Sequence, residues 1–228
     1  MGSSGFGFFI EKKRDLVEAV DAFGFVPLFA NSIPGFSVEE HVSSRVWFDG
    51  DGEGVWEWKG PVIRESGCAY GKFFENRAVF ISREWFPDFA NYRRDGYDFD
   101  ARYDDGLAPY EDKYLFELLD GNAPILSKRL KALGNYRKGG RKGFESGITR
   151  LQSQCYVVIR DFVYERGKSG RTYGWGVAEY STPERVMGPE FSSRVYQKTP
   201  RESYEAVLNH LLQILPDAEE KAVRKILK

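Results

Sequence analysis

The order of elements expected between residues 111 and 182 constrains the fold of this chain more than any other feature. Residues 111–121 and 127–133 have the leucine spacing of short amphipathic helices, and 144–154 again has apolar residues at helical spacing. Two segments rich in aromatic and β-branched residues, 155–165 and 172–182, then predict a hairpin. Three short helices followed by a twisted hairpin are typical of a winged helix-turn-helix. The sequence therefore predicts an α+β protein with winged-helix architecture.

The residues before this unit predict a mixed helical and hairpin region. Residues 8–23 carry apolar side chains roughly along one helical face, and a glycine follows them. Residues 68–74 and 78–82 have the composition of two strands joined by a short turn. Ser82 is expected to cap a helix over 83–94, as Ser127 is expected to cap the helix 127–133.

The residues after the unit predict a helical tail. Thr199 is expected as the N-cap of a long helix with Pro200 at its first position, and 217–228 form a last amphipathic helix. We therefore expect three parts, an N-terminal α+β part with a hairpin, the winged helix and the helical tail, at 1–107, 108–183 and 184–228.

Charge and cysteine usage exclude several classes of protein. The net charge is −1, so a nucleic-acid role would depend on a local excess of basic residues. Two separated cysteines and two histidines give neither a disulfide framework nor a Cys/His zinc site. There is no P-loop or Rossmann motif, so no cofactor is expected. Because neither a signal peptide nor a long apolar run is present, we expect a cytoplasmic protein without membrane contact.

A local excess of positive charge occurs in the second and third helices of the unit. Eight basic residues and one acid, Glu145, lie between positions 128 and 150; the basic residues are Lys128, Arg129, Lys131, Arg137, Lys138, Arg141, Lys142 and Arg150. Clustered Lys and Arg with nearby glycines suit contacts to DNA phosphates. Arg166, Lys168 and Arg171 would add positive charge at the tip of the hairpin.

The third helix has a polar face that would suit the major groove. Phe144, Ile148 and Leu151 are expected to be buried, which leaves a polar stripe formed by Ser146, Thr149, Arg150 and Ser153. We therefore predict double-stranded DNA as the partner, with Thr149 and Arg150 facing the groove. Basic runs are also common on solvated surfaces, and winged helices also bind proteins, so an interaction module without nucleic acid is an alternative.

The stretch from Ala90 to Gly106 contains five aspartates, Asp95, Asp98, Asp100, Asp104 and Asp105, which raises the alternative of a metal site. Arg102 occupies the third ligand position of the EF-hand template, and no glutamate closes the loop. Aromatic residues alternate with the acids, as in a loop whose rings enter a core. We expect a structural, ion-paired junction between the first two parts and no metal.

Four segments carry a resemblance to a known family. They are "VWEWKGPVIRE" (55–65), "FISREWFPDFANYRRDGYDFDARYDDGLA" (80–108), "KGFESGITRLQSQCYVVIRDF" (142–162) and "YGWGVAEYSTPE" (173–184). The chain resembles, over nearly its whole length, bacterial proteins described as related to AlkZ. It is remotely similar to the winged-helix DNA glycosylases AlkZ and YcaQ, which remove alkylpurine adducts. The resemblance implies a role in DNA repair.

The glycosylases use a Gln-x-Gln or Gln-x-Asp motif that orients a water for attack at C1′. One match exists here, Gln152-Ser153-Gln154, so Gln152 and Gln154 are the candidate catalytic residues. In the glycosylases this motif lies early in the chain, where the present sequence has Pro27 and Phe29. The glycosylases also have a histidine before the helix that corresponds to "ISREWFPDF", and the segment "WEWKGP" contains no histidine. These departures favour a DNA-binding protein without turnover over an active glycosylase on alkylated bases.

Overall fold

The first structural unit combines short helices and a small sheet. A computed structural model describes residues 9–47, 54–166 and 172–228. The elements of the first unit are α1 (Lys13–Phe23), β1 (Phe25–Pro27), a 3-10 turn (Glu39–His41), α2 (Ser44–Trp47), α3 (Val55–Ser66), β2 (Ala69–Phe74) and β3 (Arg77–Ile81). The strands form an antiparallel sheet in the order β1-β3-β2.

A second unit repeats this element order. It consists of α6 (Tyr110–Asp120), β4 (Ile125–Leu126), α7 (Ser127–Leu133), α8 (Phe144–Ser153), β5 (Val158–Arg166) and β6 (Thr172–Ser181). Its antiparallel sheet has the order β4-β6-β5, so in both units the first strand pairs with the third. The three helices and the hairpin lie where the sequence predicts them. The extended link expected before α7 becomes a strand of the sheet.

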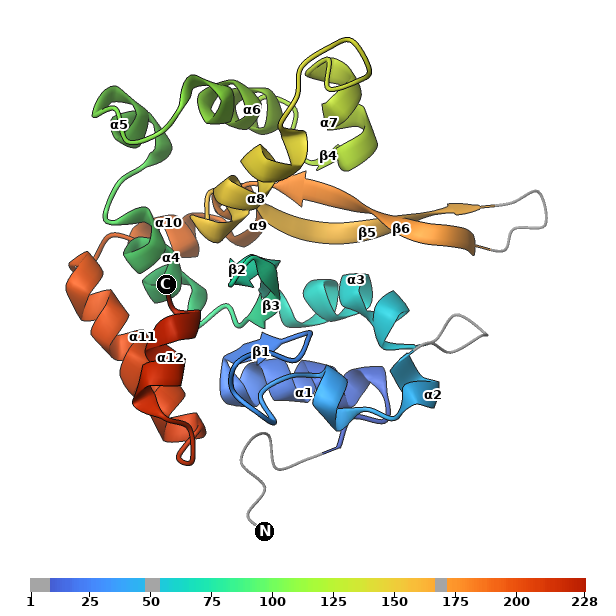
Figure 1. Ribbon diagram of the computed structural model, residues 1–228, viewed down its shortest axis with the longest axis vertical. Helices are drawn as coiled ribbons and strands as arrows, with labels where there is room; N and C mark the ends of the chain where they lie inside the picture. Colours follow the sequence, from blue (N-terminus) through green and yellow to red (C-terminus); the bar gives the residue numbers. More distant parts are fainter. Residues whose placement is uncertain (1–8, 48–53, 167–171) are drawn as a thin grey trace.

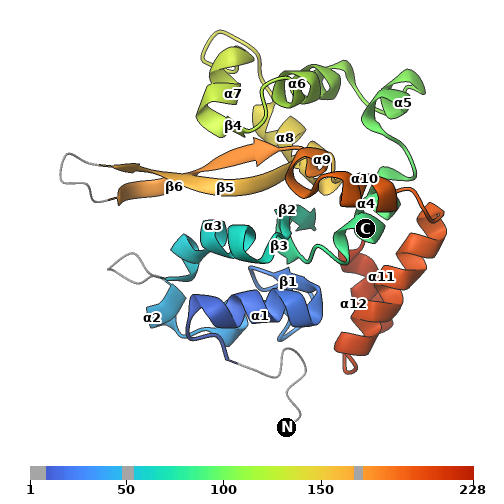
Figure 2. The ribbon, with the colours of Figure 1, turned by 180° about the vertical axis from the view of Figure 1, so that it is seen from behind.

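Further helices connect and flank the two units. They are α4 (Phe86–Arg94), α5 (Phe99–Asp104), α9 (Pro183–Met187), α10 (Pro189–Arg194), α11 (Pro200–Ile214) and α12 (Glu220–Ile226). With the C-terminus drawn at the left, α5, α6 and α7 form the top of the molecule, and α1 and α2 lie at the bottom (Figure 1). The hairpin β5–β6 extends sideways, with α6 and α7 above it and α3 below it in both views (Figures 1 and 2). None of the described helices is long and apolar enough to cross a membrane.

One continuous cluster of buried apolar side chains runs through both units and the tail, from Ile10 to Leu227. The helix α8 and the strand β5 both pack against β2, and α3 packs against β5. Aromatic rings fill much of this core: Phe89 contacts Phe25 and Phe74 edge-on, with ring centroids 5.9 and 5.7 Å apart. Because α8 and α3 contact the opposite unit's strands, the two sheets hold each other in a fixed arrangement.

Several helix boundaries differ from the sequence prediction for identifiable reasons. The first helix was predicted from residue 8, but α1 begins at Lys13. The Asp15 carboxylate accepts the backbone N–H groups of Glu11 and Lys12, and these bonds fix the N-terminal end of the helix at this point. Ser127 is the first helical residue of α7 and not its cap, which is Leu126. Thr199 caps α11 as predicted, and its hydroxyl accepts a hydrogen bond from the Glu202 N–H.

The segments of α3 and α5 are helical although the sequence did not predict a helix in either of them. The expected loop after Asp95 contains α5, which Asp98 caps by accepting the Ala101 N–H at 2.8 Å. The helix α3 forms despite Gly60 and Pro61, both poor helix residues. Its burial against α1 and β5 offsets this low propensity. The helix expected from residue 83 begins at Phe86, after a turn that Ser82 starts.

Candidate nucleic-acid interface

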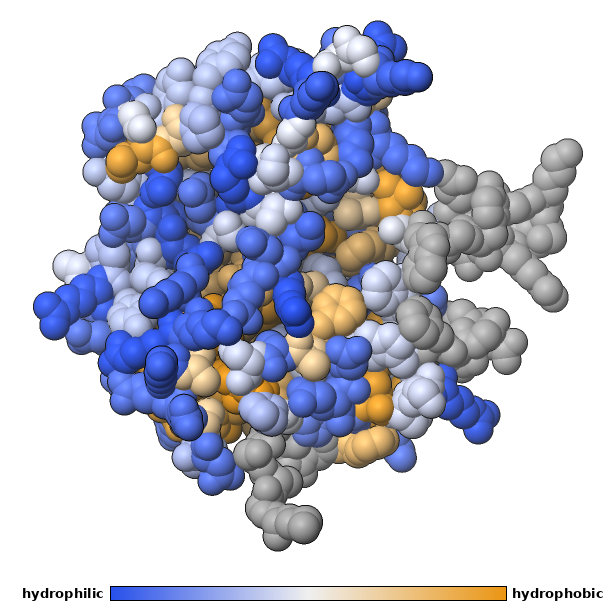
Figure 3. Space-filling model, viewed as in Figure 1, coloured by the Kyte–Doolittle hydropathy of each residue, from blue (hydrophilic) through white to orange (hydrophobic). Residues whose placement is uncertain are grey.

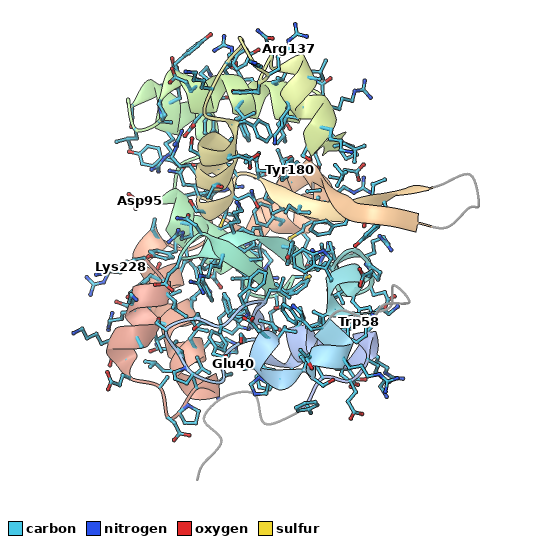
Figure 4. The ribbon with its side chains drawn as sticks, turned by 45° about the vertical axis from the view of Figure 1, so that its right-hand side comes forward. Glu40, Trp58, Asp95, Arg137, Tyr180 and Lys228 are labelled. Atoms are coloured by element: carbon cyan, nitrogen blue, oxygen red, sulfur yellow. The ribbon has the colours of Figure 1, made fainter. Side chains whose placement is uncertain are left out.

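Most of the basic residues predicted to bind DNA lie at one end of the molecule, on α7 and on the basic loop, defined as residues 134–143. Arg137 is at the outer end of the second unit, at the top of Figure 4. Strongly hydrophilic residues cover the surface over α7 in Figure 3. Lys128 and Arg129 on α7, and the loop residues Arg137, Lys138, Arg141 and Lys142, all reach the surface.

Backbone hydrogen bonds fix the shape of the basic loop. The carbonyl oxygen of Asn135 accepts the N–H groups of Arg137 and Arg141, at 3.0 and 2.8 Å. A Cβ on Gly140 would overlap this carbonyl, so the turn requires a glycine at that position. The ring of Tyr136 packs edge-on against Phe144, with centroids 5.3 Å apart, and joins the loop to α8. The loop is therefore a defined platform from which the cations project.

Most of these cations have no carboxylate partner. In the described part of the chain, no acid lies within ion-pair distance of Arg129, Arg137, Lys138, Arg141 or Lys142. Arg141 stacks on the Tyr114 ring at 3.9 Å, which leaves its charge intact. On α7, by contrast, Lys131 pairs with Glu145. The surface thus has an uncompensated positive charge at its outer edge.

The helix α8 is covered on two sides, by α6 and by β2. Phe144, Ile148 and Leu151 are buried, as the helical spacing predicts. The predicted polar stripe divides: Ser146 and Arg150 are exposed beside α6, whereas the Thr149 hydroxyl accepts a hydrogen bond at 3.1 Å from the ammonium of Lys72 on β2. Ser153 donates to the Arg150 carbonyl oxygen. The accessible part of α8 is therefore its first turn together with the side chain of Arg150.

Arg150 is held by an acid that the sequence analysis did not single out. Its guanidinium donates two hydrogen bonds to Asp112 on α6, from Nε at 2.8 Å and from Nη2 at 2.6 Å. These bonds raise the pKa of Arg150, which keeps it a permanent cation. In the sequence, Asp112 is an ordinary acid in the first turn of a helix, and no local signal marks its burial.

The two candidate catalytic glutamines lie in different environments. Gln152 is 1% exposed, its Oε1 accepts the Lys72 N–H at 3.3 Å, and its Nε2 donates to the Ile148 carbonyl at 3.1 Å. Gln154 is half-buried at the C-terminal end of α8. Both polar ends of Gln152 are thus bonded to protein, the oxygen to β2 and the nitrogen to the preceding turn of α8.

The hairpin candidates are described only in part. Arg166 is the last residue of β5, and nothing is described of its side chain. Lys168 and Arg171 lie outside the described residues.

A comparison with protein-family models shows to which family the chain belongs. The family described as AlkZ related matches residues 10–228. The chain belongs to the AlkZ-related family. This confirms the resemblance drawn from the sequence and suggests a link to AlkZ-like DNA repair proteins. No curated protein and no solved structure matches the chain.

In this AlkZ-related protein the buried contacts of the segment 90–106 come from its arginines, whereas Asp100 forms an exposed ion pair with Lys113 on α6. Arg94 is 2% exposed and donates to Glu184 at 2.7 Å, to the Tyr196 hydroxyl at 3.0 Å and to the Cys155 carbonyl at 2.8 Å. Arg93 donates to the Ser153 carbonyl at 2.7 Å. In Figure 4, Asp95 lies at the level where the second unit, drawn at the top, meets the first unit below it. Across residues 9–47, 54–166 and 172–228, no group of three His, Cys, Asp or Glu side chains is placed to hold a metal.

A buried lysine of the AlkZ-related chain was also missed by the sequence analysis. The Lys59 ammonium lies 3.4 Å from the centroid of the Trp56 ring and 4.4 Å from that of Phe162 on β5. Burial lowers the pKa of Lys59 to about 8, and Glu57 partly opposes this shift. Lys59 becomes buried only when α3 and β5, about a hundred residues apart, come together, so local patterns could not reveal it.

Proposed function

We propose that this protein binds double-stranded DNA through α7, the basic loop and the first turn of α8. The observation that carries the proposal is the group of five cations, Arg129, Arg137, Lys138, Arg141 and Lys142, that face solvent without a carboxylate partner in the described residues. Phosphate contacts of this kind supply most of the affinity of DNA-binding proteins. Membership of a family linked to DNA repair supports the same partner.

A winged-helix arrangement of residues 110–181 is part of the proposal. Three helices followed by an antiparallel hairpin, with a short strand between the first two helices, support it. The hairpin β5–β6 would correspond to the wing, and α8 to the third helix. The expected groove contact through Thr149 is left out, because its hydroxyl is bonded to Lys72.

The proposed contact is therefore mainly to the DNA backbone. The basic loop and the start of α8 form an exposed edge, and Gly143 begins α8 with no side chain capping its N–H groups. Free N–H groups at a helix N-terminus favour an anion such as a phosphate. We expect modest sequence preference, because phosphate contacts carry no direct sequence information.

Base removal is not part of the proposal. Gln152 is buried with both polar ends bonded to protein, so it has no free group to orient a water. Release of alkylated bases from duplex DNA by the unmodified protein, lost on Gln154→Ala, would establish an active glycosylase instead. No release over a broad set of adducts is the result that the proposal expects.

The experiment that tests DNA binding compares two double charge reversals. Lys138→Glu/Arg141→Glu changes the proposed surface, and Lys12→Glu/Arg14→Glu changes exposed residues at the start of α1, at the opposite end of the molecule (Figure 1). Fluorescence anisotropy with a labelled duplex should show tight binding by the unmodified protein and the α1 variant only. Equal affinity of the two variants would refute the proposed surface.

A further inference from the structure

A single buried acid controls the orientation of Arg150 at the proposed surface. The side chain of Asp112 is 2% exposed, whereas that of Arg150 is 46% exposed. The carboxylate accepts hydrogen bonds from the Nε–H and from one N–H of Nη2, so three of the five guanidinium N–H groups remain available as donors. A bidentate contact of this type fixes the plane of the guanidinium as well as its position.

The surroundings of the pair explain why the two helices can approach closely enough to form it. Gly147 lies at the crossing of α6 and α8, where an added Cβ would come within 3.1 Å of Leu115 and 3.4 Å of the Asp112 Oδ1 atom. The tighter of these contacts is with Leu115, so a glycine at position 147 lets α6 and α8 pack closely beside the pair. The pair is therefore built into the packing of the two helices.

The partly exposed guanidinium lies at a cavity between α6 and α8. The cavity has a volume of about 280 Å³, and its lining includes Lys142, Ser146 and Arg150. Lys142 belongs to the basic loop, so the cavity borders the group of uncompensated cations. The lining also includes the carboxylates of Glu111 and Asp112, and the Ser146 hydroxyl donates its proton to the Gly143 carbonyl oxygen. An oxyanion at this point would meet the Lys142 ammonium and the oriented Arg150 guanidinium, which match a phosphate, and Glu111 would oppose it.

We infer that Asp112 is a positioning residue for DNA binding, which holds Arg150 so that its remaining N–H groups contact one backbone phosphate beside Lys142. The inference rests on the proposed DNA-binding function. It makes a prediction opposite to simple electrostatics. Removing a negative charge near a DNA surface should tighten binding, whereas removing the carboxylate that orients Arg150 should weaken it.

A double-mutant cycle of Asp112→Asn and Arg150→Gln tests the inference by anisotropy at fixed, moderate salt. Arg150→Gln should weaken binding about tenfold, as for the loss of one charge-assisted contact. It should also reduce the magnitude of the negative slope of log K against log[salt] by about one. Asp112→Asn should weaken binding several-fold when Arg150 is present and leave affinity unchanged when it is combined with Arg150→Gln. A purely structural role would give the same loss in both backgrounds.

The matched control is Glu145→Gln, because Glu145 also pairs with a cation of this surface but is exposed. Its removal should tighten binding or leave it unchanged. Unchanged or tighter binding by Asp112→Asn, as by the control, would overturn the inference. If Asp112→Asn does not fold by circular dichroism, Arg150→Lys replaces it. That variant keeps the charge but cannot form the two-pronged contact, and it should bind about tenfold more weakly than the unmodified protein; equal affinity would overturn the inference.

The outcomes separate this inference from the proposed function. If the unmodified protein binds no duplex, the function and the inference both fail. If it binds, and Lys138→Glu/Arg141→Glu abolishes binding while the Asp112 and Arg150 variants do not change it, only the inference fails.

Discussion

Replacing Lys59 by methionine should stabilise the protein at neutral pH and not at high pH. The Lys59 residue is 4% exposed between Trp56 and Phe162, and burial disfavours its charged form. Its pKa is lowered from 10.5 to about 8 in the folded protein. A shift of this size corresponds to about 3 kcal/mol. The unfolded chain therefore binds the proton more tightly than the folded protein does.

The sign of the effect follows from this difference in proton binding. Between pH 8 and 10.5 the unfolded state binds more protons, so the stability contributed by this site rises with pH. Below pH 8 the folded protein has the full cost of about 3 kcal/mol. The advantage of Lys59→Met over the unmodified protein should thus shrink by about this amount between pH 7 and 10.5.

Urea unfolding, followed by tryptophan fluorescence at several pH values, measures this advantage. Other groups titrate equally in both proteins and cancel in the difference of unfolding free energies. Lys221→Met, at an exposed position of α12, controls for the loss of one positive charge. A difference for Lys59→Met that does not change between pH 7 and 10.5 would refute the reasoning.

Three further substitutions test the packing of the fold. Arg94→Leu should lower the free energy of unfolding by about 1–3 kcal/mol, because it leaves the buried Cys155 carbonyl unpaired and removes the partner of the half-exposed Glu184; Asp104→Asn, an exposed change in the same segment, should cost less than about 0.5 kcal/mol. Gln152→Ala should cost about 1–3 kcal/mol in urea unfolding, and Gln154→Ala much less, since only the first is buried with both ends bonded; equal losses would contradict the assigned role. Gly24→Ala should lower the melting temperature, because Gly24 has φ +75° and a Cβ would overlap the Trp85 ring; an unchanged melting temperature would count against this packing.

The sequence predicts those features that depend on local periodicity. The spacing of Phe144, Ile148 and Leu151 alone identifies the buried face of α8, and Thr199 and Pro200 mark the start of α11. The hairpin β2–β3 follows from two strand-like segments around a short turn. Such signals need no knowledge of tertiary structure.

The features that decide the site depend on contacts between distant residues. Asp112 and Arg150 are 38 positions apart, and Gln152 bonds to a strand 80 positions earlier. No local pattern distinguishes such residues from ordinary exposed ones. The helix α3 was missed for a related reason, because tertiary packing outweighs the weak helix propensity of Gly60 and Pro61.

The salt dependence of duplex binding tests the central claim most directly. If the five cations of α7 and the basic loop each neutralise one phosphate, log K should fall with log[salt] with a slope of about −4 to −5. Lys138→Glu/Arg141→Glu should reduce the magnitude of this slope by about two or abolish binding. A slope near zero in the unmodified protein, or an unchanged slope in this variant, would contradict the proposed interface.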